Sequence, residues 1–187
     1  MTIMARPKKF SREGVLDKSI PVFWKYGLSG CNVQQLELAT GVNKSGLYSE
    51  FASKEDLFTA ALRRYLDTGP ARKILDNAPS GWGNVEKFLL QAPFNRDEFT
   101  GCFAVNSTRE VATLPAEAVS AINAFNQDRL DSIRKNVDAE APKMDAGAVT
   151  DLIWTFFSGV CINANLEDDR DAHSERVASF LAVLKGL

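Results

Sequence analysis

The side chains best suited to chemistry in this sequence form a small, polar and basic surface in the first third of the chain. If the segment is helical, this surface consists of Lys44, Ser45, Tyr48 and Ser49, with Gly46 among them. Lysine, serine and tyrosine can bond phosphate oxygens or base edges, and small side chains let a helix lie close to a nucleic acid. These residue types therefore favour noncovalent binding to a nucleic acid.

Two short helices are needed to position this surface. Asn32 can cap an apolar-periodic run that ends at Gly41, and Asn43 can cap a second, very short helix over residues 44–51. Two short helices joined by about three residues around a glycine have the dimensions of a helix-turn-helix. We therefore expect a helix-turn-helix at about residues 32–51, followed by a connecting helix.

Three motifs in this region resemble the TetR family of transcriptional repressors. They read FWKYG at residues 23–27, GVNKSGLY at residues 41–48 and FASKEDLF at residues 51–58. Their order and spacing are those of the family, and the resemblance covers about residues 10–66. It implies an all-α fold with an N-terminal three-helix DNA-binding domain and a larger C-terminal helical domain for ligand binding and dimerisation.

The resemblance also implies which residues contact double-stranded operator DNA. Lys44 would contact a phosphate or a guanine, and Lys54 would hold another phosphate at the positive end of the connecting helix. Glu37 and Glu50 depart from the family pattern, which leaves the operator sequence open. The expected DNA-binding residues are Asn32, Gln34, Asn43, Lys44, Ser45, Gly46, Tyr48, Ser49 and Lys54.

The distribution of charge agrees with a two-part molecule. The formal net charge of −2 argues against a nucleic-acid partner when it is taken alone. Residues 1–66, however, hold ten Lys and Arg against six Asp and Glu, which leaves +4, whereas residues 67–187 hold twelve against eighteen, which leaves −6. A basic head on an acidic body is typical of a DNA-binding regulator, so we expect the two domains to divide between residues 66 and 67.

Three of these ten cations, Arg6, Lys8 and Lys9, lie on an N-terminal arm ahead of the first helix. Cations on such an arm can contact phosphates or enter a minor groove. A solubilising tail explains the same composition equally well. Both interpretations of the arm stay open at this point.

The bulk composition is that of a soluble globular protein. Its 187 residues suit one or two small domains, and contents of 45% hydrophobic and 25% charged residues are ordinary. No apolar run approaches the ~18 residues that span a bilayer, so no membrane partner is expected. Three widely separated cysteines and the lack of a signal peptide favour a reduced, cytoplasmic protein.

The sequence contains no arrangement of residues that predicts an enzyme, a metal site or a cofactor. There is no serine nucleophile elbow, no phosphate-binding loop and no zinc-type cysteine pair. The only histidine, His173, follows an acidic, polar segment, so we expect it at the surface. Cys102 could act as a redox sensor, although a buried small apolar side chain is the simpler interpretation of this residue.

Residues 67–187 show helical spacing and no strand-like alternation, which predicts helices at about 101–113, 115–137, 146–165 and 174–187. We expect a small-molecule effector to bind among these helices, because pockets combine apolar walls with a few polar groups. The low density of charge favours a mainly apolar ligand. The candidate lining residues, each of which could instead be plain core, are Trp82, Phe88, Phe103, Asn106, Phe125 and Trp154.

The last two predicted helices favour a homodimer. Apolar residues of the first span an arc of roughly 200°, wider than one core-facing stripe requires. A partner subunit would cover the second side, and two such helices from each subunit would form a four-helix interface. The expected interface residues are Leu152, Phe156, Phe157, Val160, Phe180 and Leu184.

These observations favour a transcriptional regulator, a repressor released from a palindromic operator by a small, mainly apolar ligand. Two alternatives stay open at this stage. The first is a helical protein-interaction module without DNA binding. The second is a redox-sensing regulator that acts through Cys102.

Overall fold

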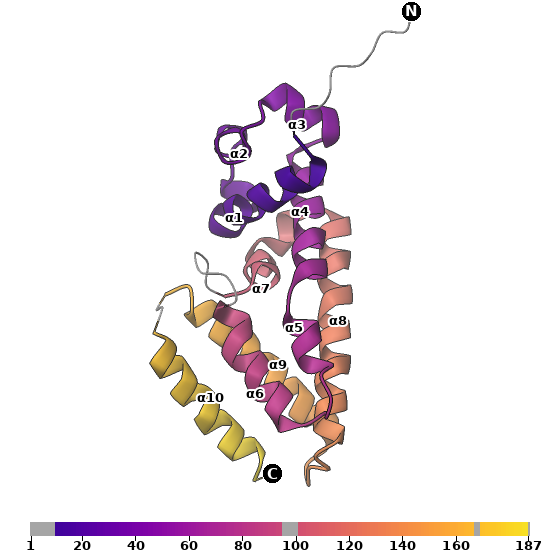
Figure 1. Cartoon of the computed structure of the whole chain (residues 1–187), viewed down its shortest axis with the longest axis vertical. Helices are drawn as coiled ribbons and strands as arrows, with labels where there is room; N and C mark the ends of the chain where they lie inside the picture. The colour runs from indigo at the N-terminus through magenta and orange to yellow at the C-terminus, as the bar shows by residue number, and fades with distance from the viewer. Residues whose placement is uncertain (1–9, 95–100, 167–168, 187) are drawn as a thin grey trace, which may run out of the picture.

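The computed structural model describes residues 10–94, 101–166 and 169–186, and these residues contain helices and no strand. The all-α fold class is therefore confirmed. Figure 1 shows a small helical head joined by one long helix to a larger helical body. The helices are α1 (Arg12–Gly30), α2 (Val33–Thr40), α3 (Lys44–Glu50), α4 (Lys54–Thr68), α5 (Ala71–Leu75), α6 (Trp82–Gln91), η1 (Ala92–Phe94), α7 (Phe103–Ser107), η2 (Thr108–Thr113), α8 (Ala116–Asp138), α9 (Ala146–Asn163) and α10 (Arg170–Leu184).

Helix α1 forms because an apolar stripe recurs at helical spacing after a serine cap. The Ser11 hydroxyl accepts from the backbone N–H of Gly14 at 3.0 Å, and Ile20 and Phe23 are fully buried. Non-helical backbone lies at Gly27, where φ is 69°, and not at Pro21, where the sequence suggests a kink. A φ of this sign favours glycine, so the main helix ends after Tyr26 and a single turn follows.

Helix α4 is the connecting helix that the sequence predicts. It packs along α1 through the edge-to-face pair of Phe23 and Phe58, whose ring centroids are 5.1 Å apart. It continues past the head and lies beside α8 in the body (Figure 1). The helix ends at Thr68, because Gly69 has extended backbone and Pro70 cannot donate to the helix.

An aromatic cluster joins the head to the body. The ring of Phe103, at the start of α7, packs edge-on against Phe58 and Tyr65 of α4, both with centroids 5.6 Å away. Trp24 of α1 stacks on the same ring at 6.1 Å. Aromatic pairs with these geometries contribute about 0.5–1.5 kcal/mol each beyond the area that they bury. The connecting helix is thus packed against both parts of the molecule.

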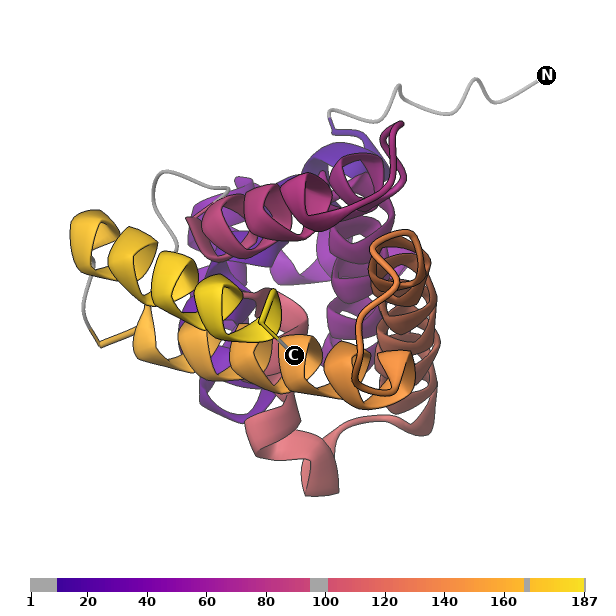
Figure 2. The same ribbon diagram turned by 90° about the horizontal axis from the view of Figure 1, so that it is seen from below.

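The body contains two helices packed on each other, α8 and α9, with α6 and α10 on one side of them (Figure 2). The single predicted helix at 101–113 is instead α7 followed by the 3-10 turn η2. His173 is not a surface residue, because it is 4% exposed and its Nε2 lies 2.9 Å from the Leu89 carbonyl oxygen. It was misplaced because α10 begins at Arg170, and this places His173 on the buried face of the helix.

Helix α9 corrects the expectation that no apolar run approaches a membrane-spanning length. Among the described residues it is the one helix that is long and apolar enough, by length and composition, to cross a bilayer. A core helix of a soluble protein passes the same test. Val149 and Ile153 of α9 are fully buried inside the chain, whereas Leu152 and Ile162 are 43% and 42% exposed. The second apolar side therefore faces outward.

Candidate nucleic-acid interface and ligand cavity

The residues around α2 and α3 build the predicted helix-turn-helix. The Asn32 side chain accepts from the backbone N–H of Gln35 at 2.9 Å, and the Gln35 side chain accepts from the N–H of Asn32 at 2.8 Å. This reciprocal capping box satisfies two N–H groups that a helix start leaves without partners. Gly41 then ends α2 in a left-handed conformation, with its N–H bonded to the Glu37 carbonyl oxygen at 2.9 Å.

Two side chains cap the start of α3. The Asn43 amide oxygen accepts from the N–H of Gly46 at 2.8 Å, and the Glu37 carboxylate accepts from the N–H of Lys44. The sequence identifies Glu37 only as a departure from the family pattern. Its position explains the departure, because a carboxylate at a helix N-terminus is favourable and holds α3 at a fixed angle to α2.

Helix α3, which carries the predicted polar surface, lies at the end of the molecule far from the body (Figure 1). Lys44, Ser45 and Ser49 are exposed, Tyr48 is 37% exposed, and the Lys44 ammonium lies 6.0 Å from the Tyr48 ring centroid. On the opposite side of α3, Leu47 is 2% exposed. Burial of that leucine leaves the polar residues together on the solvent side, with exposed Gln34 on the neighbouring helix α2.

Packing within the helix-turn-helix itself accounts for a glycine at position 46. A Cβ atom on this residue would lie 2.7 Å from Cγ1 of Val42 and 3.2 Å from the capping oxygen of Asn43. The sequence suggests that Gly46 approaches the floor of a DNA groove. The structure shows that glycine is already required for α3 to pack on the preceding turn, so its presence needs no DNA contact to explain it.

Lys54 is engaged with the protein rather than extended into solvent. Its ammonium donates to the carbonyl oxygens of Leu28 and Cys31, both at 2.8 Å. These carbonyls lie at the end of α1, where carbonyl groups lack helical partners. An ammonium has three donors, so one remains. A phosphate contact by Lys54 stays a prediction, and the sequence did not indicate its internal role. The arm with Arg6, Lys8 and Lys9 lies outside the described residues.

A contact between the head and the body involves Glu110 of η2. Its carboxylate accepts from the backbone N–H of Leu28 at 3.1 Å and from that of Ser29 at 2.8 Å. A Cβ atom on Gly27 would lie 1.7 Å from the same carboxylate. Sequence reasoning missed Glu110, and the glycine that ends α1 was the only local signal for this contact.

A small cavity lies in the body at the end of α4. It is lined from α4 and α5 by Tyr65, Leu66, Gly69, Pro70 and Ala71, and from the other helices by Phe88, Cys102, Phe125, Arg129 and Phe157. Its volume is about 20 Å³. The wall is apolar and aromatic except for Arg129.

The structure brings together only part of the predicted ligand-binding set. Phe88 and Phe125 line the cavity, and their contact with a ligand stays a prediction. Phe103 and Asn106 instead line an open cleft of about 710 Å³ between α1 and η2. Trp82 lies at the start of α6, and Trp154 packs on Phe157 with centroids 5.2 Å apart. The sequence missed Arg129 because an arginine in a long polar helix normally faces solvent.

The cysteines are buried and poorly suited to reaction. Burial raises the pKa of the Cys102 thiol, and the Tyr65 hydroxyl donates to its sulfur at 3.4 Å. Burial also raises the pKa of Cys161 well above its ordinary value. Reactive cysteines are thiolates with lowered pKa values, so the structure does not favour the redox-sensor alternative. Within the described residues, no three His, Cys, Asp or Glu side chains gather closely enough to hold a metal ion.

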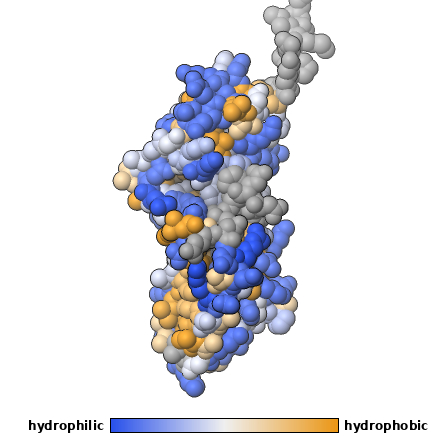
Figure 3. Space-filling model, turned by 90° about the vertical axis from the view of Figure 1, so that its left-hand side faces the viewer, coloured by the Kyte–Doolittle hydropathy of each residue, from blue (hydrophilic) through white to orange (hydrophobic). Residues whose placement is uncertain are grey.

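Helices α9 and α10 present an apolar face, but not with all of the predicted residues. The rings of Phe156 and Phe180 stack with centroids 3.9 Å apart, and both are partly exposed. Figure 3 shows apolar side chains gathered on the lower part of this side of the molecule. The buried members of the predicted interface must be corrected, because they point into the core of their own subunit: Phe157 is 3%, Val160 4% and Leu184 2% exposed.

Comparison with known proteins identifies a family. The family model for bacterial regulatory proteins of the tetR family matches residues 15–61. The chain is 32% identical over 108 residues to the HTH-type transcriptional repressor ComR of Escherichia coli, with 54% of this chain and 51% of ComR covered. The chain thus spans about half the length of that relative. It is 25% identical over 187 residues to the HTH-type transcriptional repressor BdcR of E. coli, with 98% and 91% covered.

Solved structures share the whole architecture. A cysteine mutant of the TetR family transcriptional regulator CifR, complexed with 26-bp double-strand operator DNA, has a TM-score of 0.80 and 26% sequence identity. That match covers 96% of this chain and 100% of the other. A TetR family regulator from Agrobacterium tumefaciens has a TM-score of 0.81 at 14% identity, which shows the fold alone.

Proposed function

Because the chain belongs to the TetR family of transcriptional regulators, we propose that it is a DNA-binding repressor, released from a palindromic operator by a small, mainly apolar ligand. The observation that carries this proposal is the outer face of α3. Lys44, Ser45, Tyr48 and Ser49 project together from a helix that Asn43 and Glu37 fix at its start. The solved structure of CifR with operator DNA, at 26% identity, supports the same use of this domain here.

Recognition requires two copies of the chain. One seven-residue recognition helix reads too few bases, and two helices related by a two-fold axis can reach half-sites about 34–36 Å apart. The stacked pair of Phe156 and Phe180, with exposed Leu152 beside it, is the surface that we assign to the dimer. A homodimer through this face also accounts for the two apolar sides of α9.

The ligand would act through α4. The cavity touches its last turn at Tyr65 and Leu66, and the opposite end of the helix begins directly after the recognition helix. A ligand that fits better when this last turn is displaced would favour an orientation of the head that separates the two recognition helices from their half-sites.

We infer regulation rather than catalysis, in the cytoplasm, where operator DNA is found. The protein-interaction alternative does not explain why the exposed face of α3 is basic and small. The redox alternative requires a reactive thiol, whereas burial raises the pKa of Cys102.

A mobility shift tests the proposal. The wild-type chain is expected to bind the DNA upstream of its own gene and to be a dimer in light scattering. Phe156→Glu places a charge in the apolar face, so it should give a mass near the 20.6 kDa of one chain and lose the shift. Met144→Glu, at a residue that is 38% exposed in the loop before α9, is the matched control and should behave as wild type.

Two outcomes would contradict the proposal. If the wild-type protein binds the upstream DNA no better than unrelated DNA of equal length, it is not an operator-binding repressor of this site. If Phe156→Glu remains a dimer, the interface lies elsewhere.

A further inference from the structure

Arg129 of α8 is a buried cation with an incomplete set of hydrogen bonds. Its side chain is 4% exposed, and its Nη1 donates to the Asp128 carboxylate at 2.9 Å. Among the described residues this is its one hydrogen bond, and its buried Nε has no acceptor. A buried donor without an acceptor is destabilising, and most buried polar groups have a partner, so the arrangement calls for an explanation.

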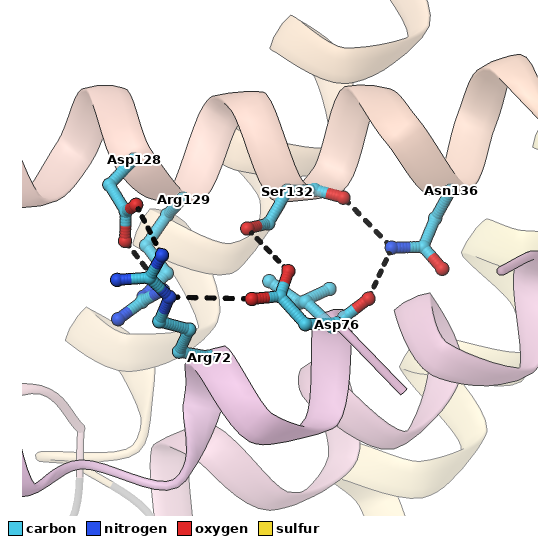
Figure 4. Close-up of polar contacts among 7 residues, drawn as sticks. Arg72, Asp76, Asp128, Arg129, Ser132 and Asn136 are labelled. Carbon is cyan, nitrogen blue, oxygen red and sulfur yellow. Dashed lines mark hydrogen bonds and ion pairs between the residues drawn. The ribbon is translucent and has the colours of Figure 1, made fainter. Parts of the chain in front are cut away.

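The neighbouring carboxylate does not supply the acceptor. Asp76 accepts from the Ser132 hydroxyl at 3.0 Å and pairs with Arg72 at 3.3 Å. Figure 4 shows Asp76 directed toward these two residues, while dashed lines join Asp128 to both Arg72 and Arg129. Arg72 also lies 3.7 Å from Asp128, so Asp128 is shared between the two arginines, whereas Asp76 pairs with Arg72 and not with Arg129. The Nε side of the Arg129 guanidinium is left without a partner.

The cavity at the end of α4 is the space that this guanidinium borders. Of the described residues that line it, Arg129 alone is charged, and the other walls include the rings of Phe88, Phe125 and Phe157. Burial also lowers the pKa of Arg129, which means that its surroundings do not fully compensate its charge. An apolar chamber with one cation in its wall favours an apolar molecule that carries one negative group.

A groove between α4 and α8 adjoins the cavity. This groove has a volume of about 410 Å³ and includes Leu66, Gly69, Phe125 and Arg129, which also line the cavity. These four residues therefore form the wall between the cavity and the groove. The Arg129 guanidinium carbon lies 4.6 Å from the Phe125 ring centroid. Movement of the Phe125 ring would join the two spaces.

We propose that the effector is a small monocarboxylate with a flat apolar body, and that its carboxylate is bound by the Nε and Nη2 edge of Arg129. This assignment rests on the repressor function proposed above and refines the expectation of a mainly apolar ligand. The free edge of a guanidinium offers two parallel N–H groups, the geometry that matches two carboxylate oxygens. Asp128 keeps Nη1 and so orients that edge.

The size of the cavity explains how such a ligand would act. Ligand pockets usually measure about 300–1,000 Å³, far above the 20 Å³ present here. The apolar body must therefore displace part of the wall, and Leu66 and Gly69 at the end of α4 are in that wall. Ligand binding would therefore displace the C-terminal end of the connecting helix.

Calorimetry and thermal shift on the full-length dimer test the proposal. The probes are phenylacetate and cinnamate, each paired with its primary amide. The acids are expected to bind the wild-type protein about tenfold to a hundredfold more tightly than the amides, the range expected for hydrogen bonds to a charged group. Arg129→Met should abolish this preference, and Arg129→Lys should retain only part of it, because lysine keeps the charge without the paired donors.

The matched control is Arg72→Met. Arg72 contacts the same Asp128, but it is exposed and does not line the cavity, so the preference for acids should remain. Equal binding of acids and amides to the wild-type protein would overturn the proposal, as would a preference that survives Arg129→Met. It would also be overturned if no acid binds a protein that still shifts its operator. Loss of operator binding by the wild-type protein would instead count against the repressor function.

Discussion

The surroundings of the two ends of α4 differ in how completely their polar groups are satisfied. At the N-terminal end, Ser53 caps the helix by accepting from the N–H of Asp56 at 3.2 Å. Lys54 bonds the Leu28 and Cys31 carbonyls at 2.8 Å each. The cap completes the first turn of the helix, and the two Lys54 bonds tie that end to the head.

The C-terminal end of α4 has the opposite character. The helix stops at Gly69 and Pro70, both of which line the cavity. Arg129 borders the same space with a donor that has no acceptor. Local stability follows the density of such contacts, so ligand binding can reposition the C-terminal end more easily than the N-terminal end. A helix fixed to the head and adjustable in the body can carry a ligand signal to the recognition helices.

The largest expected effect comes from removing the Lys54 bonds at the N-terminal end of α4. Lys54→Met should lower the free energy of unfolding by about 1.5–3 kcal/mol, because two carbonyl groups lose a charged donor. Urea unfolding followed by circular dichroism measures this change, with Lys87→Met on the exposed face of α6 as the control. If Lys54→Met unfolds at the wild-type urea concentration and only weakens DNA binding, Lys54 serves as a phosphate contact and not as an anchor.

A smaller loss is expected at the contact between head and body. Glu110→Gln keeps the shape but loses the charge that accepts from Leu28 and Ser29, so stability should fall by about 1 kcal/mol. Release of operator DNA should also require a higher ligand concentration, because the head is then less firmly coupled to η2. Glu117→Gln, in the exposed first turn of α8, is the control. An unchanged ligand response in Glu110→Gln would show that coupling runs through α4 alone.

A substitution at Gly69 can restrict the backbone at the C-terminal end of α4. A Cβ atom on Gly69 would lie 3.5 Å from the Tyr65 carbonyl oxygen, an ordinary contact, and its φ of −65° suits any residue. Gly69→Ala should therefore raise stability by about 0.4–1 kcal/mol through the unfolded chain. Thermal unfolding measures the gain, and DNA release by ligand should need a higher ligand concentration. A loss of stability would contradict the view that this end is unstrained.

The smallest effect is expected for the pH dependence of stability, through His173 of α10 and not through α4. Burial lowers the pKa of His173 below its ordinary value of 6.5, and the Leu89 carbonyl and Arg176 modify the shift. The unfolded chain then binds a proton more readily than the folded one, so stability is lost as pH falls from 6.5 toward the lower folded pKa. Melting temperatures between pH 8 and 5 should show a smaller acid loss in His173→Gln. An identical pH profile in both proteins would exclude this histidine as the cause.

The sequence predicted those parts of the molecule that depend on local signals. Asn32, Asn43 and Ser53 are capping residues, and Gly27 and Gly41 end helices, so the helix-turn-helix and α4 could be placed within a residue or two. The exposure of Lys44 and Tyr48 followed from the burial of the opposite side of α3.

Apart from the Glu37 cap on α3, the contacts that the sequence missed are long-range. Glu110 meets residues 28 and 29 across more than 80 positions, and Lys54 meets Leu28 and Cys31 across more than 20. The burial of Arg129 depends on how α8 packs on α4 and α5, which no local pattern encodes. Phe157 was misassigned to the dimer because apolar spacing shows that α9 has two apolar sides, but not which side faces its own subunit.

The salt dependence of operator binding tests the central assignment most directly. Fluorescence anisotropy with labelled upstream DNA, between about 50 and 200 mM salt, gives the slope of log affinity against log salt concentration. Lys44→Ala should weaken binding and reduce the slope by about one unit per chain, whereas Lys25→Ala, beside the cleft between head and body, should leave the slope unchanged. An unchanged slope in a folded Lys44→Ala dimer would show that the outer face of α3 does not meet DNA.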